Sequence, residues 1–172
     1  IQFTTDDFNC YESPLNGEEV YNLCPAIVTA VTSGTYANFF LSQVDGNSQL
    51  GWRGIFVYDD EIQPEVGDKL DLVSAHVDEY NTTTQIEDVI LNGIISSGNS
   101  VNPQSISTGD LGIDCSWEGE RWEGMLVKVT NVTVEEITTY GELIIDDGSG
   151  QTMVDNYYFE DLVDLSDYEV GD

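Results

Sequence analysis

Residues 54–60 read Gly-Ile-Phe-Val-Tyr-Asp-Asp, and residues 64–72 read Pro-Glu-Val-Gly-Asp-Lys-Leu-Asp-Leu. Apolar residues fall largely at strand spacing in both segments, which predicts a strand, an acidic turn, a Val-Gly-Asp corner and a second strand. Gly67 lies where the chain must turn sharply, and glycine adopts positive φ without steric cost. Residues 169–172 repeat the Glu-Val-Gly-Asp corner. The repeated corner indicates two related units in one chain.

Short strands separated by polar turns are predicted on both sides of the first corner. The expected strands of the first unit are residues 26–31, 35–43, 54–58, 70–79 and 84–91. Five strands with short turns fit a small Greek-key barrel, of which the OB-fold is the commonest five-stranded example. A β-sandwich predicts similar spacing and stays open as an alternative.

A second unit is predicted after a linker rich in Ser, Asn, Gly and Pro. Its strands are expected at residues 122–132, 140–147 and 151–159, with a hairpin turn at 148–150. Its fourth and fifth strands should follow the second corner, so we expect an incomplete second barrel in this chain. The predicted fold is all-β, with two tandem OB-like barrels. The expected parts are an N-terminal arm (1–19), a first barrel (20–95), a linker (96–116) and the incomplete second barrel (117–172).

Acidic residues dominate the composition, with 33 Asp and Glu against 4 Lys and Arg and a formal net charge of −29. A nucleic-acid binder needs a basic patch, which Arg53, Lys69, Arg121 and Lys128 cannot supply. We therefore expect no nucleic-acid partner and no anionic membrane partner. No stretch approaches the ~20 apolar residues of a membrane-spanning helix. Because Ile1 is the first residue, we expect that a signal or pro-segment was removed or that the sequence is a piece of a longer chain.

The cysteines and two sequence motifs favour an extracellular or cell-surface location. Cys10, Cys24 and Cys115 lack zinc-ligand spacing, and one disulfide with one free or intermolecular thiol fits an oxidising compartment. A Cys10–Cys115 bridge would hold the arm to the linker, and a Cys10–Cys24 bridge stays open as the alternative. N-glycosylation sequons at Asn81 and Asn131 fit a secreted glycoprotein.

The sequence shows no catalytic constellation, so we expect a protein that is not an enzyme. The only histidine, His76, lies in a predicted strand with no recognisable nucleophile motif. Calcium is the one cofactor considered, because Asp45 and Asn47, and likewise Asp146 and Asp147, place oxygen ligands on tight turns. Hairpin turns also favour Asp and Gly for backbone reasons alone.

Six aromatic residues are candidates for a carbohydrate-binding or peptide-binding platform, although such residues also cover the open ends of barrels. They are Trp52, Tyr58, Trp117, Trp122, Tyr157 and Tyr158.

A family resemblance rests on the order of short motifs in the first unit. These motifs are Val28-Thr29-Ala30-Val31, Phe39-Phe40-Leu41, residues 54–58, Val66-Gly67-Asp68 and residues 77–86. In this order the chain resembles secreted OB-fold-like modules of Bacteroidota cell-surface and type-IX-secreted proteins. Such modules also accompany extracellular endonuclease/exonuclease/phosphatase-type nucleases. Residues 123–150 resemble the companion repeat, and the whole resemblance covers residues 13–172. It implies a fold rather than an activity, and the chain contains no nuclease domain.

These expectations favour a non-catalytic extracellular structural or adhesive module that self-associates into a homo-oligomer or polymer. A sheet that lacks two strands exposes backbone groups along an edge, which natural proteins pair or cover. The arm residues Ile1, Gln2, Phe3, Thr4 and Thr5 form a short predicted strand that could fill this edge in a neighbouring subunit. Repeated head to tail, this strand complementation builds a filament. The alternatives are an accessory binding domain of a secreted nuclease or other hydrolase, and a fragment of a longer surface protein.

Overall fold

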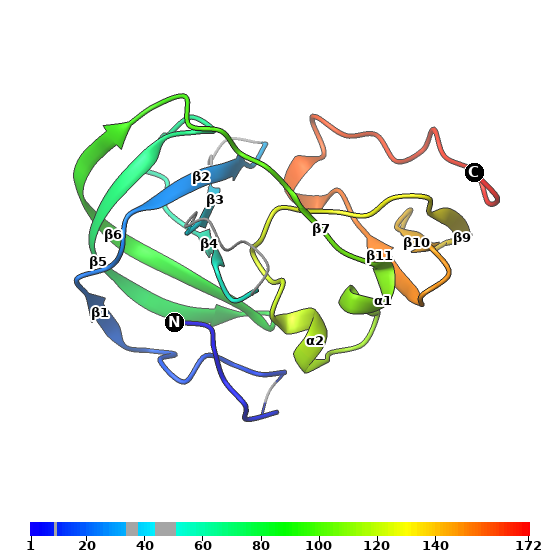
Figure 1. Ribbon diagram of the computed structural model, residues 1–172, viewed down its shortest axis with the longest axis horizontal. Helices are drawn as coiled ribbons and strands as arrows, with labels where there is room; N and C mark the ends of the chain where they lie inside the picture. Colours follow the sequence, from blue (N-terminus) through cyan, green and yellow to red (C-terminus); the bar gives the residue numbers. More distant parts are fainter. Residues whose placement is uncertain (9, 34–37, 44–50) are drawn as a thin grey trace.

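The computed structural model describes residues 1–8, 10–33, 38–43 and 51–172 (Figure 1). A barrel formed by the first half of the chain lies beside a smaller sheet formed by the second half. The strands and helices, in chain order, are β1 (Glu19–Tyr21), β2 (Ala26–Val31), β3 (Phe39–Ser42), β4 (Gly54–Val57), β5 (Lys69–Tyr80), β6 (Thr83–Ser96), β7 (Gln104–Ser105), α1 (Thr108–Leu111), α2 (Trp117–Glu120), β8 (Val127–Lys128), β9 (Thr133–Ile137), β10 (Leu143–Asp146), β11 (Gln151–Val154) and η2 (Tyr157–Phe159).

Five strands close the barrel in the first half of the chain. Strand β3 pairs with β2 and β4, and β5 pairs with β2 and β6, all antiparallel. A parallel pairing of β4 with β6 completes the ring, and β1 adds to β5. The closed ring excludes the β-sandwich alternative and confirms the predicted all-β, OB-like fold. The predicted strands at 26–31, 54–58, 70–79 and 84–91 correspond to β2, β4, β5 and β6.

The barrel core is built from the alternate residues of these strands. Along β5, burial alternates over most of the strand, as expected when one face of a strand packs on a core. The largest fully buried apolar side chains of the barrel are Val28, Phe39, Leu41, Val57, Leu70, Val77 and Ile86. The residues between them face outward, and some of these outward residues build the site described below.

The first Val-Gly-Asp corner docks on β2 through backbone hydrogen bonds. The Gly67 amide donates to the Val28 carbonyl, and the Val28 amide donates to the Asp68 carbonyl, both at 2.9 Å. The Asp68 carboxylate accepts from the Glu65 amide at 3.0 Å and closes the turn. Gly67 has φ +91, and a Cβ there would lie 2.8 Å from the Asn99 carbonyl oxygen. Glycine at this corner therefore satisfies both the backbone angle and the packing.

The second corner repeats these contacts on β9. The Gly171 amide donates to the Val134 carbonyl at 2.9 Å, and the Val134 amide donates to the Asp172 carbonyl at 3.0 Å. The Asp172 carboxylate accepts from the Glu169 amide at 2.7 Å. Strands β2 and β9 also share a bulge one residue after the valine held by the corner. The repeated sequence motif therefore forms the same local structure twice.

The second unit forms a three-stranded antiparallel sheet in the order β11-β10-β9. The predicted strand at 140–147 forms as β10, and a hairpin joins it to β11. The predicted strand at 151–159 is correct only over β11, and its end is wrong, because Tyr157–Phe159 form the 3₁₀ helix η2. The predicted strand at 122–132 is wrong. That segment follows α2 as turns and contributes only β8, which pairs in parallel with β7. The first strand of the sheet is instead β9.

Three further expectations are corrected or limited by the structure. The predicted linker 96–116 contains two short elements, β7 and α1. The arm 1–5 is not a strand. The expected second strand, 35–43, forms only as β3, and residues 35–37 lie outside the described residues. Among the described residues, no helix has the length and apolar character needed to cross a membrane.

Candidate ligand-binding cleft

A cross-strand row of side chains on the outer face of the barrel forms the floor of a cleft. The pairings Phe40 with Phe56, Phe56 with Gln85, and Gln85 with Asp78 run across β3, β4, β6 and β5. Because residues two apart on a strand share a face, Tyr58 and Glu87 lie on the same surface, next to this row. The pairing of strands therefore gathers aromatic and acidic residues that are far apart in the sequence.

The wall of the cleft comes from η2 in the second half of the chain. The Tyr158 carbonyl accepts a hydrogen bond from the Ser33 amide at 2.9 Å, which ties η2 to the barrel. The Tyr158 ring lies 4.9 Å from Phe56 and 5.8 Å from Phe40, between ring centroids. Tyr157 packs edge-on against Tyr158 at 5.2 Å. Aromatic pairs in this range stabilise a defined ring arrangement.

The resulting cavity has a volume of about 550 Å³. This volume falls within the range of roughly 300–1,000 Å³ that is typical of small-molecule sites. Its lining residues are Thr32, Ser33, Asn38, Phe56, Tyr58, Asp78, Tyr80, Gln85, Glu87, Tyr157 and Tyr158. Aromatic rings with a few polar groups among them are the usual composition of a ligand site.

The polar groups of the cleft include the carboxyl groups of Asp78 and Glu87, the amides of Asn38 and Gln85, and the hydroxyls of Thr32 and Ser33. Gln85 Nε2 donates to Asp78 Oδ2 at 3.2 Å, which orients both side chains. Burial raises the pKa of the Glu87 carboxyl, and the charges of Asp78 and Asp88 raise it further, whereas His76 lowers it. Burial also raises the pKa of the Tyr158 phenol. The cleft therefore combines aromatic rings with neutral polar groups and two acidic side chains.

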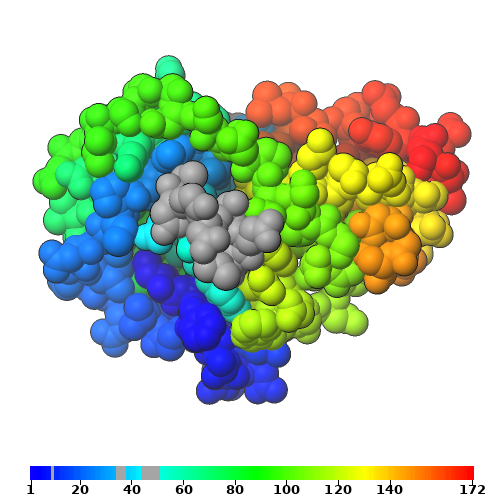
Figure 2. All heavy atoms as spheres, in the orientation of Figure 1, coloured from blue at the N-terminus to red at the C-terminus, as the bar shows by residue number. Residues whose placement is uncertain are grey.

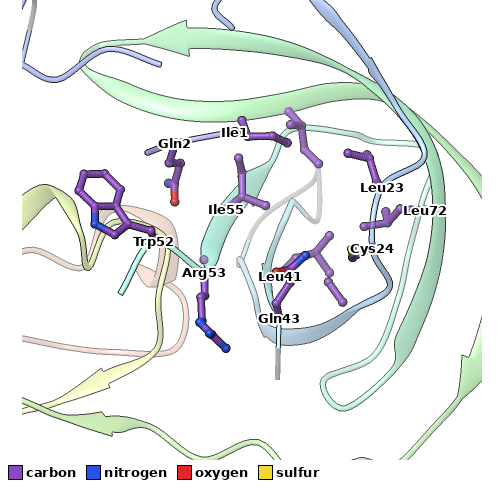
Figure 3. Close-up of a pocket in the computed structure, with 13 residues that line it drawn as sticks. Ile1, Gln2, Leu23, Cys24, Leu41, Gln43, Trp52, Arg53, Ile55 and Leu72 are labelled. Atoms are coloured by element: carbon purple, nitrogen blue, oxygen red, sulfur yellow. The ribbon is translucent and has the colours of Figure 1, made fainter. Parts of the chain in front are cut away.

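A smaller cavity lies at one end of the barrel, where the arm covers it (Figure 3). Its volume is about 130 Å³. Figure 3 shows Ile1 and Gln2 of the arm together with Leu41, Ile55 and Leu72 of the barrel around this space. The free thiol of Cys24 is exposed and also contributes to the lining. We interpret this small cavity as a packing void between the arm and the barrel rather than as a ligand site.

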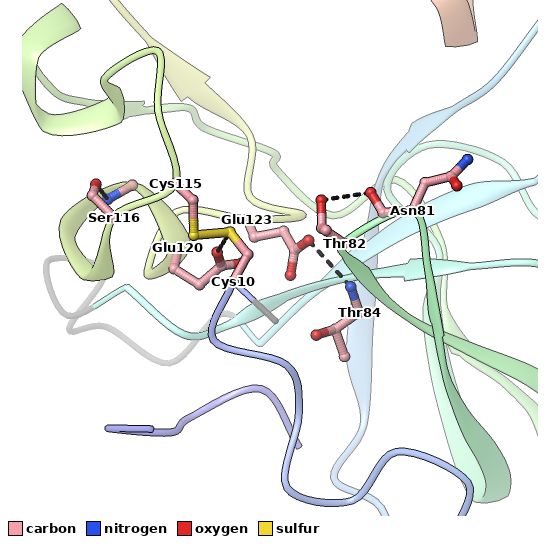
Figure 4. The surroundings of a disulfide bond; sticks show 9 residues. Cys10, Asn81, Thr82, Thr84, Cys115, Ser116, Glu120 and Glu123 are labelled. Atoms are coloured by element: carbon pink, nitrogen blue, oxygen red, sulfur yellow. Dashed lines mark hydrogen bonds between the residues drawn. A yellow bond between two sulfur atoms is a disulfide. The ribbon is translucent and has the colours of Figure 1, made fainter. Parts of the chain in front are cut away.

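A disulfide joins Cys10 to Cys115, with their Cα atoms 5.7 Å apart (Figure 4). It attaches the arm to the segment before α2, and Figure 2 shows the arm (blue) lying against that segment (yellow-green). Trp117 Nε1 donates to the Thr4 carbonyl at 3.2 Å. Gln2 and Thr4 are 5% and 8% exposed, so the arm is packed on its own chain.

Three carboxyl groups gather beside this disulfide. Glu123 accepts from the Thr84 amide at 3.1 Å and from Gln2 Nε2 at 3.0 Å. Glu79 accepts from Thr84 Oγ1 at 3.1 Å. Glu120 Oε2 lies 3.4 Å from Cys10 Sγ. Because both sulfur atoms are in a disulfide, this group lacks the thiolates that a cysteine metal site requires.

Burial is the main reason that these carboxyl groups are hard to ionise. It raises the pKa of Glu123 to about 8, with further contributions from the charges of Glu120 and Glu79. It raises the pKa of Glu120 to about 7, with a contribution from Glu79. The pKa of Glu79 is also raised by burial. Glu123, with the highest of these pKa values, is therefore mostly protonated at neutral pH, and its contacts with Gln2 and Thr84 hold the arm to β6.

The hairpin carboxylates considered for calcium serve the turn itself. Asp147 accepts from Thr108 Oγ1 at 2.9 Å and from the Ser149 amide at 3.0 Å. The hydroxyl of Ser149 also donates to Asp147, at 2.5 Å, and this bond together with that from the Thr108 hydroxyl lowers the pKa of Asp147 to about 2. Asp146 accepts from the amides of Gly148 and Gly150, at 2.6 and 3.1 Å. Calcium binding at this turn stays a prediction.

The other predicted site residues are dispersed over the molecule. Asp45 and Asn47 lie outside the described residues. The sequon residues Asn81 and Asn131 are both exposed. The six candidate aromatic residues separate into two groups. Tyr58, Tyr157 and Tyr158 line the cleft, whereas Trp52 and Trp117 pack together and Trp122 lies under Arg121.

Sequence reasoning missed Phe56, Asp78, Tyr80, Gln85 and Glu87 as cleft residues. Their signal is the outward position in predicted strands, which becomes readable once the register of β4, β5 and β6 is known. Comparison with protein-family models gives no match, and comparisons with curated proteins and with solved structures give none either.

Proposed function

We propose that this protein is a non-catalytic extracellular module that adheres to its target through the cleft between the barrel and η2. The observation that carries the proposal is the convergence of Phe56, Tyr58, Tyr157 and Tyr158 on one cavity, from elements far apart in the sequence. Such a cavity offers ring faces for stacking and polar groups for orientation. The ligand classes that fit are carbohydrates and other small organic molecules.

The extracellular part of the proposal is supported by the disulfide and by the surface. Disulfides persist in oxidising compartments, and Cys10–Cys115 fixes the arm to the rest of the fold. The two sequon asparagines are exposed and accessible to a glycosylating enzyme.

The non-catalytic part is supported by the positions of the perturbed acids. General acid catalysis uses a carboxyl group whose pKa is raised towards neutrality. The two carboxyl groups raised furthest, Glu120 and Glu123, lie beside the disulfide, and Glu123 accepts hydrogen bonds from Gln2 and Thr84. The hydrogen bonds of Glu123 serve the attachment of the arm to β6.

NMR titration of the isotope-labelled protein with saccharides and small organic molecules tests the proposal. We expect the backbone amides of β4, β6 and η2 to shift on binding. The double substitution Tyr58→Ala and Tyr157→Ala should weaken that binding about tenfold or more, as expected for the loss of two ring contacts. Tyr140→Ala is the matched control, because Tyr140 is 90% exposed and does not line the cleft. Equal binding by the two variants would contradict the proposal.

A second candidate function is self-association through the sheet of the second unit. This candidate is supported by the repeated corner. In the first unit, the equivalent corner leads into β5, which pairs with β2 and β6. A strand from another molecule could take the corresponding place in the second sheet. Strand addition at a sheet edge is a common mode of association. Because the arm is attached to its own chain by Cys10–Cys115, strand donation by residues 1–5 requires the arm to be released. Electron microscopy of the native protein, with and without reduction, tests this candidate: regular fibres support it, and single particles under both conditions oppose it.

The accessory-domain alternative makes a separate prediction about nucleic acids. With a net charge of −29, the protein should show no measurable binding to single-stranded oligonucleotides at physiological salt. Fluorescence anisotropy with a labelled oligonucleotide measures this directly, and salt-sensitive micromolar binding would favour the nuclease-associated role.

A further inference from the structure

The cleft combines accessible ring faces with acidic side chains. Tyr58, Tyr80 and Tyr157 are 55%, 62% and 70% exposed, so their rings are available to a ligand. Asp78 and Glu87 line the same cavity. None of the described residues that line it is Lys or Arg. Aromatic ring faces attract cations, and recognition of ammonium groups by aromatic cages is the established use of this interaction.

An acidic groove continues from the cleft and shares Tyr58 and Glu87 with it. The groove has a volume of about 410 Å³. Its lining residues are Tyr58, Asp59, Asp60, Glu61, Glu87, Asp88, Val89 and Ile90. The aromatic cleft therefore opens at one end into a surface on which five of the eight lining side chains carry a carboxyl group.

Local backbone structure orients this acidic surface. Asp59 accepts from the amides of Glu61 and Val89, at 2.9 and 3.3 Å, and so joins the two sides of the groove. Asp88 has φ +50 and lies at a bulge where β6 shifts register against β5. Bulges redirect side chains, and here the bulge turns two consecutive acidic residues of β6 towards the groove.

The carboxylates of this surface repel one another in the unliganded protein. The charges of Asp78 and Asp88 both disfavour ionisation of Glu87. His76, which pairs with Glu87 across the strands, has the opposite effect on the Glu87 pKa. A bound cation would relieve this repulsion, whereas a neutral ligand would not.

We propose that the cleft binds an organic ammonium cation, with the ammonium group against the tyrosine rings and between Asp78 and Glu87. A ligand with a second ammonium group places that group in the acidic groove. The inference rests on the proposed function, because it specifies the ligand class of the same cleft.

Calorimetry with a matched pair of small probes tests the role of charge. Choline is the cation, and 3,3-dimethylbutan-1-ol is its neutral isostere, in which carbon replaces the ammonium nitrogen. We expect choline to bind about tenfold or more tightly than the isostere at physiological ionic strength. Spermidine, which carries several ammonium groups, should bind more tightly than choline. Comparing spermidine with a short lysine peptide shows whether the cleft prefers the ammonium groups of a polyamine or those of a peptide. Equal affinity for choline and its isostere would overturn the inference.

Charge-matched variants separate a specific site from general attraction to an acidic protein. The double substitution Asp78→Asn and Glu87→Gln should reduce choline affinity about tenfold. The control is Glu135→Gln with Glu136→Gln, because both residues are exposed on β9 and the change in net charge is the same. Thermal melting confirms that both variants are folded. An equal loss of affinity in the two variants would overturn the inference.

The outcome also separates this inference from the function on which it rests. Binding of a neutral saccharide at the cleft amides, with no binding of choline or spermidine, would leave the proposed function standing and overturn the inference. Binding of neither class would overturn both.

Discussion

Glu123 lies where three parts of the chain meet: the arm, β6 and the turn after α2. Its carboxyl group accepts from Gln2 Nε2 and from the Thr84 amide. Two accepted hydrogen bonds favour the ionised form, but burial and the neighbouring acids outweigh them and raise the pKa to about 8. Because Glu123 also contacts the arm through Gln2, the protonation state of its carboxyl group makes attachment of the arm depend on pH.

We predict that the protonated carboxyl group of Glu123 stabilises the folded protein and that this stabilisation is lost as pH rises. Its folded-state pKa of about 8 lies above its ordinary value of 4.5. Between these values the folded state retains a proton that the unfolded state has lost. The stabilisation is fully present below pH 4.5, and the free energy of unfolding falls by about 1.4 kcal/mol per pH unit through this window.

Urea unfolding of the wild type and of Glu123→Gln measures this effect. The amide is neutral at every pH and retains an oxygen that accepts from Thr84, so the variant should lose this component of the pH dependence. Glu135→Gln, an exposed substitution on β9, is the control. If the wild type and Glu123→Gln show parallel pH profiles between pH 5 and 8, the assignment to Glu123 is wrong.

At the scale of residues, the sequence identified the aromatic candidates but not their grouping. Tyr58, Tyr157 and Tyr158 meet because Ser33 holds η2 to the barrel through a backbone hydrogen bond. That contact leaves no periodic signal in the sequence. The acidic residues of the cleft could not be predicted from the sequence. A chain with 33 acidic residues contains so many possible carboxylate pairs that nothing singles out Asp78 and Glu87.

Among the elements, the N-terminal arm depends most on a single covalent bond. The disulfide closes a loop with a sequence separation of 105 residues. We predict that the double substitution Cys10→Ser and Cys115→Ser lowers the free energy of unfolding by about 2–4 kcal/mol, because the unfolded chain regains the entropy of that loop. The released arm should also become a site of proteolytic cleavage.

Urea unfolding and limited proteolysis of this variant check both effects. Cys24→Ser is a matched control, because Cys24 is an exposed free thiol and its substitution should change stability by no more than about 0.5 kcal/mol. An arm that resists protease equally in both variants would show that its hydrogen bonds to Trp117 and Glu123 suffice to hold it.

Strand β4 approaches the segment after α2 so closely that its first residue must be glycine. A Cβ on Gly54 would overlap the backbone of Gly124 and Met125. We predict that Gly54→Ala destabilises the protein by about 1–3 kcal/mol, in the range of overpacked sites. Ser42→Ala, at the paired position on β3, adds no volume and should have a smaller effect. Equal unfolding midpoints in urea would show that the two segments can separate at little cost.

The strands that sequence reasoning located are those with several buried residues in alternation. Strand β5 has this pattern over most of its length, so the sequence alone predicted a strand there. Strand β9 was missed because only Val134 is buried among its five residues. The segment 122–132 was wrongly predicted as a strand because its run of apolar residues satisfies the pattern. The turns after α2, with Gly124 at φ +65, prevent an extended conformation there.

For the whole molecule, the repeated corner and the shared bulge relate the two units, but the described cores of the two units differ in size. In the first unit, β5 and β6 close the barrel around Val28 and Leu41. In the second, Leu165 and Val132 pack beside the smaller core of Val134, Leu143 and Ile145. The smaller core buries less apolar surface and contributes less to stability. The contacts with the barrel should therefore matter more to the second unit than to the first.

We predict that the two units unfold together, because the rings of η2, which belongs to the second unit, pack against aromatic side chains of the barrel. The rings of Phe40 and Phe159 are stacked at 6.4 Å, and Phe40 also contacts Tyr158. The double substitution Phe40→Ala and Tyr158→Ala removes these ring contacts. It should lower the free energy of opening of the second sheet by about 1–3 kcal/mol, in line with the loss of partly buried aromatic contacts.

Native-state hydrogen exchange measures this coupling directly. In the wild type, the most protected amides of β10 should exchange with a free energy close to that of β5. In the double variant, the amides of β10 should exchange faster while those of β5 change less. Tyr140→Ala, a substitution of a residue that is 90% exposed, controls for a general effect of losing a tyrosine. If β10 in the wild type already exchanges far faster than β5, the second sheet opens independently. The ring contacts of η2 with Phe40 would then not couple the second sheet to the barrel.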